Sequence, residues 1–135
     1  MIAIGTKCQV QREVTPDMTA YEIGSGLLPV LATPWVAALM ENAAMTCLQG
    51  YLEKGQGSVG TAIALSHDAP TPVGGTIWAE AEVSAVSPDG RRVEFRVRAW
   101  DQSGGVSEGT HTRAVIWNER FLERCAGRAK KKTEE

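Results

Sequence analysis

One carboxylate stands out among the side chains that can do chemistry. Glu41 is the only charged residue between Thr33 and Glu53, in a segment dominated by alanine, leucine and methionine. Such a segment predicts a helix covered by protein on most sides, where an isolated carboxylate costs free energy. Glu41 therefore either faces a cavity with hydrogen-bond partners or is destabilised as an anion, and a nucleophile or general base needs such an environment. A carboxylate at a solvent gap, or bonded to nearby backbone, fits the same pattern.

Two histidines lie on predicted strands. His67 ends the run VGTAIALSH just before a turn that contains Pro70, and there it either relays a proton at neutral pH or caps the strand end. His111 competes for the same role in the last strand. It shares a face with Arg113, and the two form either a solvent-facing pair or part of an anion site.

Thr33 and Gly60 are further candidates. Thr33 precedes Pro34, a pattern typical of a helix N-cap followed by proline at the first helical position. Backbone N–H groups at a helix start can stabilise an oxyanion, and a hydroxyl there can bind or attack a carbonyl. Gly60, inside a strand, either relieves packing or lets a ligand lie along the backbone. The Arg91-Arg92 pair and the Lys130 to Lys132 run are interpreted as solvated charge.

The surrounding sequence indicates how these residues are positioned. An irregular apolar segment, residues 18–32, separates a first strand from a central helix. Alternating apolar and polar residues predict antiparallel strands joined by short turns, notably the one at Ser87 to Gly90. The predicted elements are a strand at 2–14, a helix at 34–53, and strands at 59–67, 77–85, 93–99 and 106–118.

This order predicts an α+β fold in which a five-stranded antiparallel sheet wraps around one long central helix. Residues 1–118 form the domain, and residues 119–135 are expected to be a charged, frayed tail. Trp78 falls on the polar face of its strand, where water is otherwise expected, so a second copy is expected to cover that face.

Composition narrows the classes of function. The chain has 135 residues and a formal charge of -2, and residues 1–118 alone carry eight basic and twelve acidic residues. This balance excludes a typical nucleic-acid binder. The three cysteines are widely spaced and odd in number, which indicates no disulfide framework or metal site and favours a reducing, cytoplasmic compartment. No leader or membrane span is expected, because Glu41 and Asn42 interrupt the longest apolar stretch.

Three blocks of the sequence carry a resemblance to a known family. They read ATPWVAALMENA, YLEKGQGSVGTAIALSHDAPTPVGGT and SEGTHTRAVI, and together they span roughly residues 32–117. They resemble the fluoroacetyl-CoA thioesterase type of the hotdog-fold thioesterase superfamily. The expected topology, a long helix wrapped by an antiparallel sheet, matches the hotdog fold independently.

The resemblance implies a reaction and a set of residues. It places the family's catalytic threonine, glutamate and histidine on Thr33, Glu41 and His67, and a glycine that binds the thioester region on Gly60. The implied reaction is hydrolysis of an acyl-CoA thioester to a carboxylic acid and free CoA, with no cofactor because CoA is part of the substrate. Glu41 would be the nucleophile or base, and His67 would handle the proton. The family also implies a homodimer, with pairing of dimers into tetramers open, in which Thr33 and Glu41 face the partner's His67.

The sequence departs from the family pattern near the helix start. Pro34 stands where the family has a glycine, and the segment before it is shorter and lacks the phenylalanines that recognise fluorine. A short or medium acyl-CoA is therefore the expected substrate, with an apolar pocket wall formed by Leu27, Leu28, Leu31 and Trp35. Two alternatives stay open: a non-catalytic hotdog protein that binds acyl-CoA or supports an assembly, and an enoyl-CoA hydratase or dehydratase.

Overall fold

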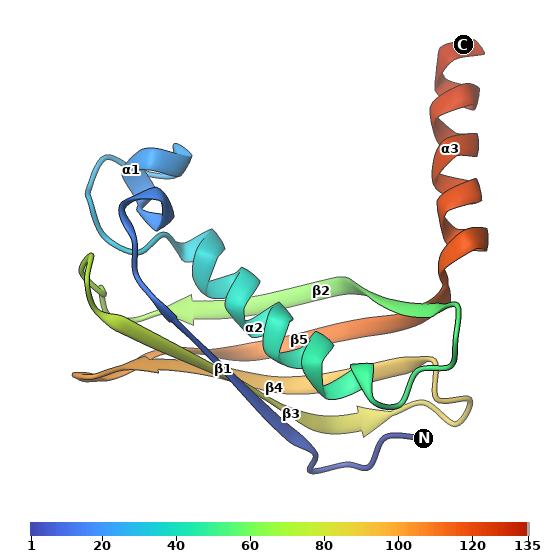
Figure 1. The fold of residues 1–135 in the computed structure, drawn as a ribbon, viewed down its shortest axis with the longest axis horizontal. Coiled ribbons are helices and arrows are strands. Elements are labelled where there is room, and N and C mark those ends of the chain that lie inside the picture. Colours follow the sequence, from blue (N-terminus) through green and yellow to red (C-terminus); the bar gives the residue numbers. More distant parts are fainter. Residues whose placement is uncertain (135) are drawn as a thin grey trace.

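One antiparallel sheet curves around a long helix (Figure 1). The computed structural model describes residues 1–134, with side chains to residue 130. The strand order across the sheet is β1-β3-β4-β5-β2. In chain order the elements are β1 (Lys7–Glu13), η1 (Pro16–Met18), α1 (Ala20–Ile23), α2 (Thr33–Gln49), β2 (Gln56–His67), β3 (Thr76–Val86), β4 (Arg92–Asp101), β5 (Gly104–Trp117) and α3 (Asn118–Glu134).

The two central strands confirm the expected alternation. The inward side chains of β3 and β4 are buried, including Ile77, Val83 and Phe95, and Ala79 lies opposite Ala99 across the ladder. Their outward side chains form charged pairs on the other face of the sheet. This division follows from the period of two in a strand, which sends successive side chains to opposite faces.

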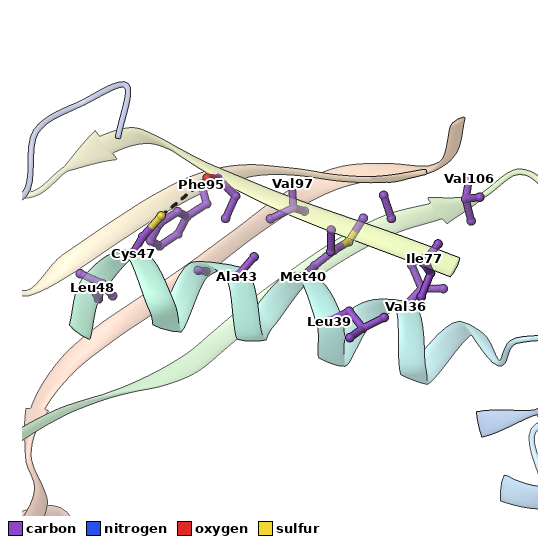
Figure 2. Close-up of a cluster of buried hydrophobic side chains, with 14 of the residues drawn as sticks. Val36, Leu39, Met40, Ala43, Cys47, Leu48, Ile77, Phe95, Val97 and Val106 are labelled. Carbon is purple, nitrogen blue, oxygen red and sulfur yellow. Dashed lines mark hydrogen bonds between the residues drawn. The ribbon is translucent and has the colours of Figure 1, made fainter. Parts of the chain in front are cut away.

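Helix α2 packs its apolar side chains onto this inner face, and Figure 2 shows Met40 and Cys47 among the residues of the core. The helix is shorter than predicted: it ends at Gln49 rather than residue 53, with Gly50 as its C-cap. Glycine is a poor helix former, and the four residues beyond it form a turn and loop instead.

The segment between β1 and α2 forms a lid at one end of the molecule (Figure 1). Strand β1 covers only part of the predicted range 2–14, and the lid contains η1 and α1. Backbone hydrogen bonds tie the lid down: Leu31 donates to the Thr71 carbonyl at 3.0 Å, and Ala32 donates to the Met18 carbonyl at 3.0 Å. These bonds join the end of the lid to the β2–β3 connection and join η1 to the N-cap of α2.

Strand β2 behaves differently from the central strands. It lies at the edge of the sheet, pairs only with β5, and carries a bulge at Thr61. Residues 60–64 are all exposed, including the inward positions. An edge strand with small, uncharged, exposed residues is a template for pairing with another strand.

The C-terminal residues also differ from the prediction. A helix, α3, occupies the segment expected to be a frayed tail, and it rises away from the sheet at the end opposite the lid (Figure 1). Phe121, Leu122 and Cys125 recur at helical spacing among charged residues, which favours an amphipathic helix. Within the described residues, no helix is both long and apolar enough to cross a bilayer.

Candidate active site

The first functional contact joins the start of α2 to the end of β2. The Thr33 hydroxyl oxygen lies 2.6 Å from His67 Nδ1. Thr33 is not the helix N-cap, as the sequence predicted, but the first helical residue; Ala32 takes the cap position and supplies no side-chain hydrogen bond. The correction has a chemical consequence, because the hydroxyl is bonded to an imidazole rather than to the backbone of its own helix.

The other ring nitrogen of His67 has no partner. Among the described residues, His67 Nε2 is the one buried side-chain polar atom without a hydrogen bond. Buried polar atoms are almost always paired, so an unpaired one requires an explanation. An imidazole fixed at Nδ1 and free at Nε2 is arranged to exchange a proton with a group that the isolated chain does not contain.

The second functional contact lies in the middle of α2, where Glu41 faces the β2 backbone. A Cβ atom added to Gly60 would lie 2.8 Å from Glu41 Oε2 and 3.1 Å from His111 Cε1. Gly60 is therefore a glycine because a carboxylate approaches the strand closely. This explains the close approach that the sequence indicated, and the approaching group belongs to the protein itself.

A buried arginine lies beside Glu41. Arg113 is 6% exposed, and its Nε and Nη2 atoms donate to the hydroxyl and the carbonyl of Ser58, both at 3.0 Å. Burial lowers the pKa of the Arg113 guanidinium, and the nearby negative charge of Glu41 opposes that shift. The guanidinium is thus held as a fixed positive charge near the Glu41 carboxylate.

His111 completes this cluster as a neutral group. Its Nδ1 lies 2.8 Å from the Ala62 carbonyl oxygen and must donate to it, so Nε2 accepts from Arg113 Nη1 at 3.3 Å. Desolvation by burial lowers the pKa of His111, and the Arg113 charge lowers it further. Of the two alternatives for His111 and Arg113, the structure excludes a solvent-facing pair: both side chains are buried.

The candidate residues thus form two separate groups within one chain. Thr33 and His67 make the first, which we call the helix-start pair; Glu41, Gly60, His111 and Arg113 make the second, the mid-helix cluster. Thr33 and Glu41 are eight residues apart on α2, about 12 Å at 1.5 Å per residue. Thr33 contacts His67 of its own chain and not of a partner, contrary to the expectation, whereas the expectation that Glu41 faces the partner's His67 stays a prediction.

The four predicted pocket residues do not form a common wall in one chain. Leu31 is buried in the core, and Trp35 packs against that core. Leu27 and Leu28 project from the lid, 86% and 66% exposed. The exposed pair is free to meet a substrate or a second copy of the chain.

Sequence reasoning missed Ser58 and did not resolve the role of Arg113. Ser58 lies 55 residues before Arg113, and no spacing rule connects them before β2 and β5 are paired. The available signal was the alternation of side chains along β5, which places His111 and Arg113 on one face of the strand. Only the register of the sheet shows that this face points toward Glu41.

A larger hollow of about 720 Å³ lies on the outer face of the sheet, away from both groups. Four of the charged side chains that line it pair across the strands: Arg98 donates to Glu80 at 3.0 Å, and Arg96 lies 3.8 Å from Glu82. Within the described part of the chain, no three histidine, cysteine, aspartate or glutamate side chains gather at metal-binding distance. The candidate chemistry therefore belongs to the inner face, between α2 and β2.

Comparisons with known proteins agree with this geometry. The model of the family described as fluoroacetyl-CoA-specific thioesterase matches residues 14–119. The fluoroacetyl-CoA thioesterase of Streptantibioticus cattleyicolor is 46% identical over 92 residues, which cover 68% of this chain and 65% of the relative. The chain thus matches just under two thirds of that relative's length.

Solved structures confirm the predicted hotdog fold. A mutant of the fluoroacetyl-CoA-specific thioesterase FlK, in complex with fluoroacetate and CoA, superimposes with a TM-score of 0.83 at 37% identity, covering 88% of this chain and 98% of the other. A thioesterase superfamily member from Thermus thermophilus superimposes with a TM-score of 0.87 at 26% identity, covering 99% and 97%. The chain belongs to the family of fluoroacetyl-CoA-specific thioesterases.

Proposed function

We propose that the protein hydrolyses the thioester bond of a short or medium acyl-CoA, giving a carboxylic acid and free CoA without a cofactor. The observation that carries this proposal is the Glu41 carboxylate, held against Gly60 beside the buried Arg113. Membership of a thioesterase family supports it, as does the FlK relative that binds fluoroacetate and CoA.

The chemistry requires an attacking oxygen and a protonated leaving group. Glu41 either takes a proton from water, whose oxygen then attacks the thioester carbon, or attacks that carbon itself and forms an anhydride that water opens. In both routes the C–S bond breaks as the tetrahedral oxyanion collapses. The CoA sulfur leaves with a proton supplied through His67. The backbone N–H of Thr33 is available to the oxyanion, because Pro34 has no N–H and those of Trp35 and Val36 donate to the Ala32 carbonyl.

The two groups of residues can act together if the chain pairs with a second copy through β2. Antiparallel pairing with the two-fold axis between Ile63 and Ala64 would set Gly60 near the partner's His67. Each of two equivalent sites would then combine the mid-helix cluster of one chain with the helix-start pair of the other. This arrangement would cover the exposed edge of β2 and supply a partner for His67 Nε2.

Pairing also bears on substrate choice. The same two-fold arrangement would carry the exposed Leu27 and Leu28 of the lid toward the partner's cluster, where an acyl group would lie. Aliphatic side chains in this place favour an apolar acyl chain over a selective site for fluorine. All three cysteines are free thiols, which supports the cytoplasmic location that we propose.

Thiol release from a panel of acyl-CoA esters tests the activity. The panel runs from acetyl to long-chain esters and includes fluoroacetyl-CoA, with wild type compared to Glu41→Ala. We expect release by wild type, strongest for short or medium chains, and none above background by the variant. Binding without release would favour a non-catalytic acyl-CoA-binding protein, and water addition to an enoyl-CoA would favour a hydratase.

Subunit mixing tests whether the site is shared between chains. Glu41→Ala and His67→Ala chains are each expected to be nearly inactive alone. Unfolded together and refolded at equal concentration, half of the dimers should be mixed, and each mixed dimer should contain one intact site. We expect recovery to about a quarter of wild-type activity. No recovery, with mixed dimers present, would mean that both groups act within one chain.

A further inference from the structure

We infer that the adenosine 3′,5′-bisphosphate end of CoA binds in a groove around Trp117, where β5 runs into α3. This inference rests on the proposed function, because it assigns the nucleotide part of the same substrate. The groove consists of two adjoining hollows of about 170 and 420 Å³. Both are lined by Arg91, Val115 and Trp117, so they form one continuous surface.

The smaller hollow has the chemistry of a phosphate site. Arg91, from the turn before β4, and Arg120 and Arg124, one turn apart on α3, line it together, and no acidic side chain does. Guanidinium groups bind phosphate oxygens through paired, charge-assisted hydrogen bonds. Three convergent arginines match the phosphates of CoA better than any neutral ligand.

These arginines differ from those on the outer face of the sheet. Arg96 and Arg98 on β4 each pair with a glutamate of β3, at 3.8 and 3.0 Å. Among the described residues, Arg120 and Arg124 make no ion pair within 4.0 Å. Arg91 makes none within that distance either, although hydrogen bonding and, after it, the Arg91 charge lower the pKa of the neighbouring Asp89 carboxyl. Residues 1–118 carry more acidic than basic residues, so a substrate with three phosphates needs a local positive site of this kind.

The larger hollow supplies a surface for the adenine ring. Trp117 is 37% exposed and Tyr51 is 51% exposed, and both line this hollow. Exposed aromatic rings stack on nucleobases. Glu53, Asp89 and Arg91 line the same hollow, where the two carboxylates can accept hydrogen bonds from ribose hydroxyls. Arg91 also lines the smaller hollow, so the base-binding part adjoins the phosphate-binding part directly.

The groove lies within reach of the reacting atoms. Arg113, Val115 and Trp117 alternate along β5, so all three side chains point to the face on which α2 packs. Trp117 lies four positions after Arg113 on the strand, about 13 Å away at 3.3 Å per residue. An extended pantetheine arm spans that distance, which places the thioester beside Glu41 when the phosphates contact the arginines. Figure 1 shows α3 leaving the end of β5 at this point.

Two measurements on the double variant Arg120→Ala/Arg124→Ala test the inference. The first is calorimetric binding of adenosine 3′,5′-bisphosphate, which needs no turnover. The second compares KM for an acyl-CoA with KM for the same acyl group on N-acetylcysteamine, which lacks the nucleotide. The matched control is Arg96→Ala/Arg98→Ala, which removes the same charge from the outer face.

We expect the α3 double variant to weaken bisphosphate binding and to raise KM for acyl-CoA by about tenfold or more, which corresponds to about 1.4 kcal/mol or more. The N-acetylcysteamine ester should be hydrolysed at the wild-type rate, and the control should behave as wild type. Unchanged bisphosphate binding in the variant, or equal losses in the control, would overturn the inference. If no thioester is hydrolysed at all, the proposed function fails, while the binding measurement still decides whether the groove takes a nucleotide.

Discussion

The helix-start pair and the mid-helix cluster differ in how far one chain completes them. In the cluster, every side-chain nitrogen of Arg113 has a hydrogen-bond partner, and the buried His111 is bonded at both ring nitrogens. In the pair, Thr33 is exposed and His67 Nε2 is unpaired. One chain therefore preorganises the groups that surround Glu41, the carboxylate that we propose takes part in the reaction. The helix-start pair, in contrast, keeps one buried ring nitrogen without a hydrogen-bond partner.

The strongest test of this comparison removes the carboxylate from the mid-helix cluster. Glu41→Ala should lower kcat by about a thousandfold, within the range usual for loss of a base or nucleophile. The variant should fold with reduced stability, because the buried Arg113 loses its nearby counter-charge. Thiol release measures the rate, and size-exclusion chromatography with circular dichroism checks assembly and fold. Near wild-type turnover would exclude Glu41 from the chemistry.

Removing the imidazole from the helix-start pair should have a smaller effect on the rate. His67→Ala should lower kcat by about a hundredfold and flatten the dependence of the rate on pH near neutrality, since this variant lacks the proposed proton carrier. Thr33→Val and Thr33→Ser serve as a matched pair, because only serine keeps the hydroxyl that contacts Nδ1. If the pH profile of His67→Ala is unchanged, the proton is carried by water or by His111 instead.

A third test disturbs the mid-helix cluster without removing any functional group. Gly60→Ala places a Cβ where Glu41 Oε2 lies 2.8 Å away, so the carboxylate must move. Displacement of a reacting group costs rate, and we expect kcat to fall about tenfold. The melting temperature should fall slightly, because the buried His111, 3.1 Å from the added Cβ, must also shift. Gly105→Ala is the control, because nothing lies within 4 Å of its added Cβ. A fall in the free energy of unfolding as large as the rise in the activation free energy, about 1.4 kcal/mol for a tenfold loss of rate, would contradict the interpretation.

The helix-start pair and the mid-helix cluster also show what could be predicted from sequence. The singular charge of Glu41 and the glycine at position 60 are local signals, and both lie in the mid-helix cluster. The alternation of β3 and β4 was equally local, and the structure confirms their inner face. Such features depend on neighbours along the chain, which a period of two or a break in composition records.

The remaining features depend on contacts between distant segments. Thr33 meets His67 across 34 residues, and the local pattern of threonine before proline favoured an N-cap instead. Burial does not alternate along β2, because this strand lies at the sheet edge and its residues 60–64 are exposed. The role of Arg113 required the pairing of β2 with β5. Sequence pattern identified the residues, and the register of the sheet decided which of them meet.

The smallest effect concerns the neutral state of His111. Burial lowers the pKa of His111 below its ordinary 6.5, so the folded protein takes up this proton at a lower pH than the unfolded chain. Between those two values the unfolded chain binds more protons, and the free energy of unfolding falls as the pH falls, by up to about 1.4 kcal/mol per pH unit. Above pH 6.5 this contribution is fully present.

His111→Gln should remove that dependence, because glutamine retains a donor for the Ala62 carbonyl and an acceptor for Arg113 but does not titrate. Urea unfolding at pH 7.5, 6.5 and 5.5, at one protein concentration because the chain is expected to dimerise, measures the difference. Wild type should lose more stability than the variant between pH 7.5 and 5.5, because only wild type has an imidazole whose pKa is lowered in the folded state. Parallel losses in the two proteins would show that the cluster tolerates a charged His111. The mid-helix cluster would then be less complete within one chain than its hydrogen bonds indicate.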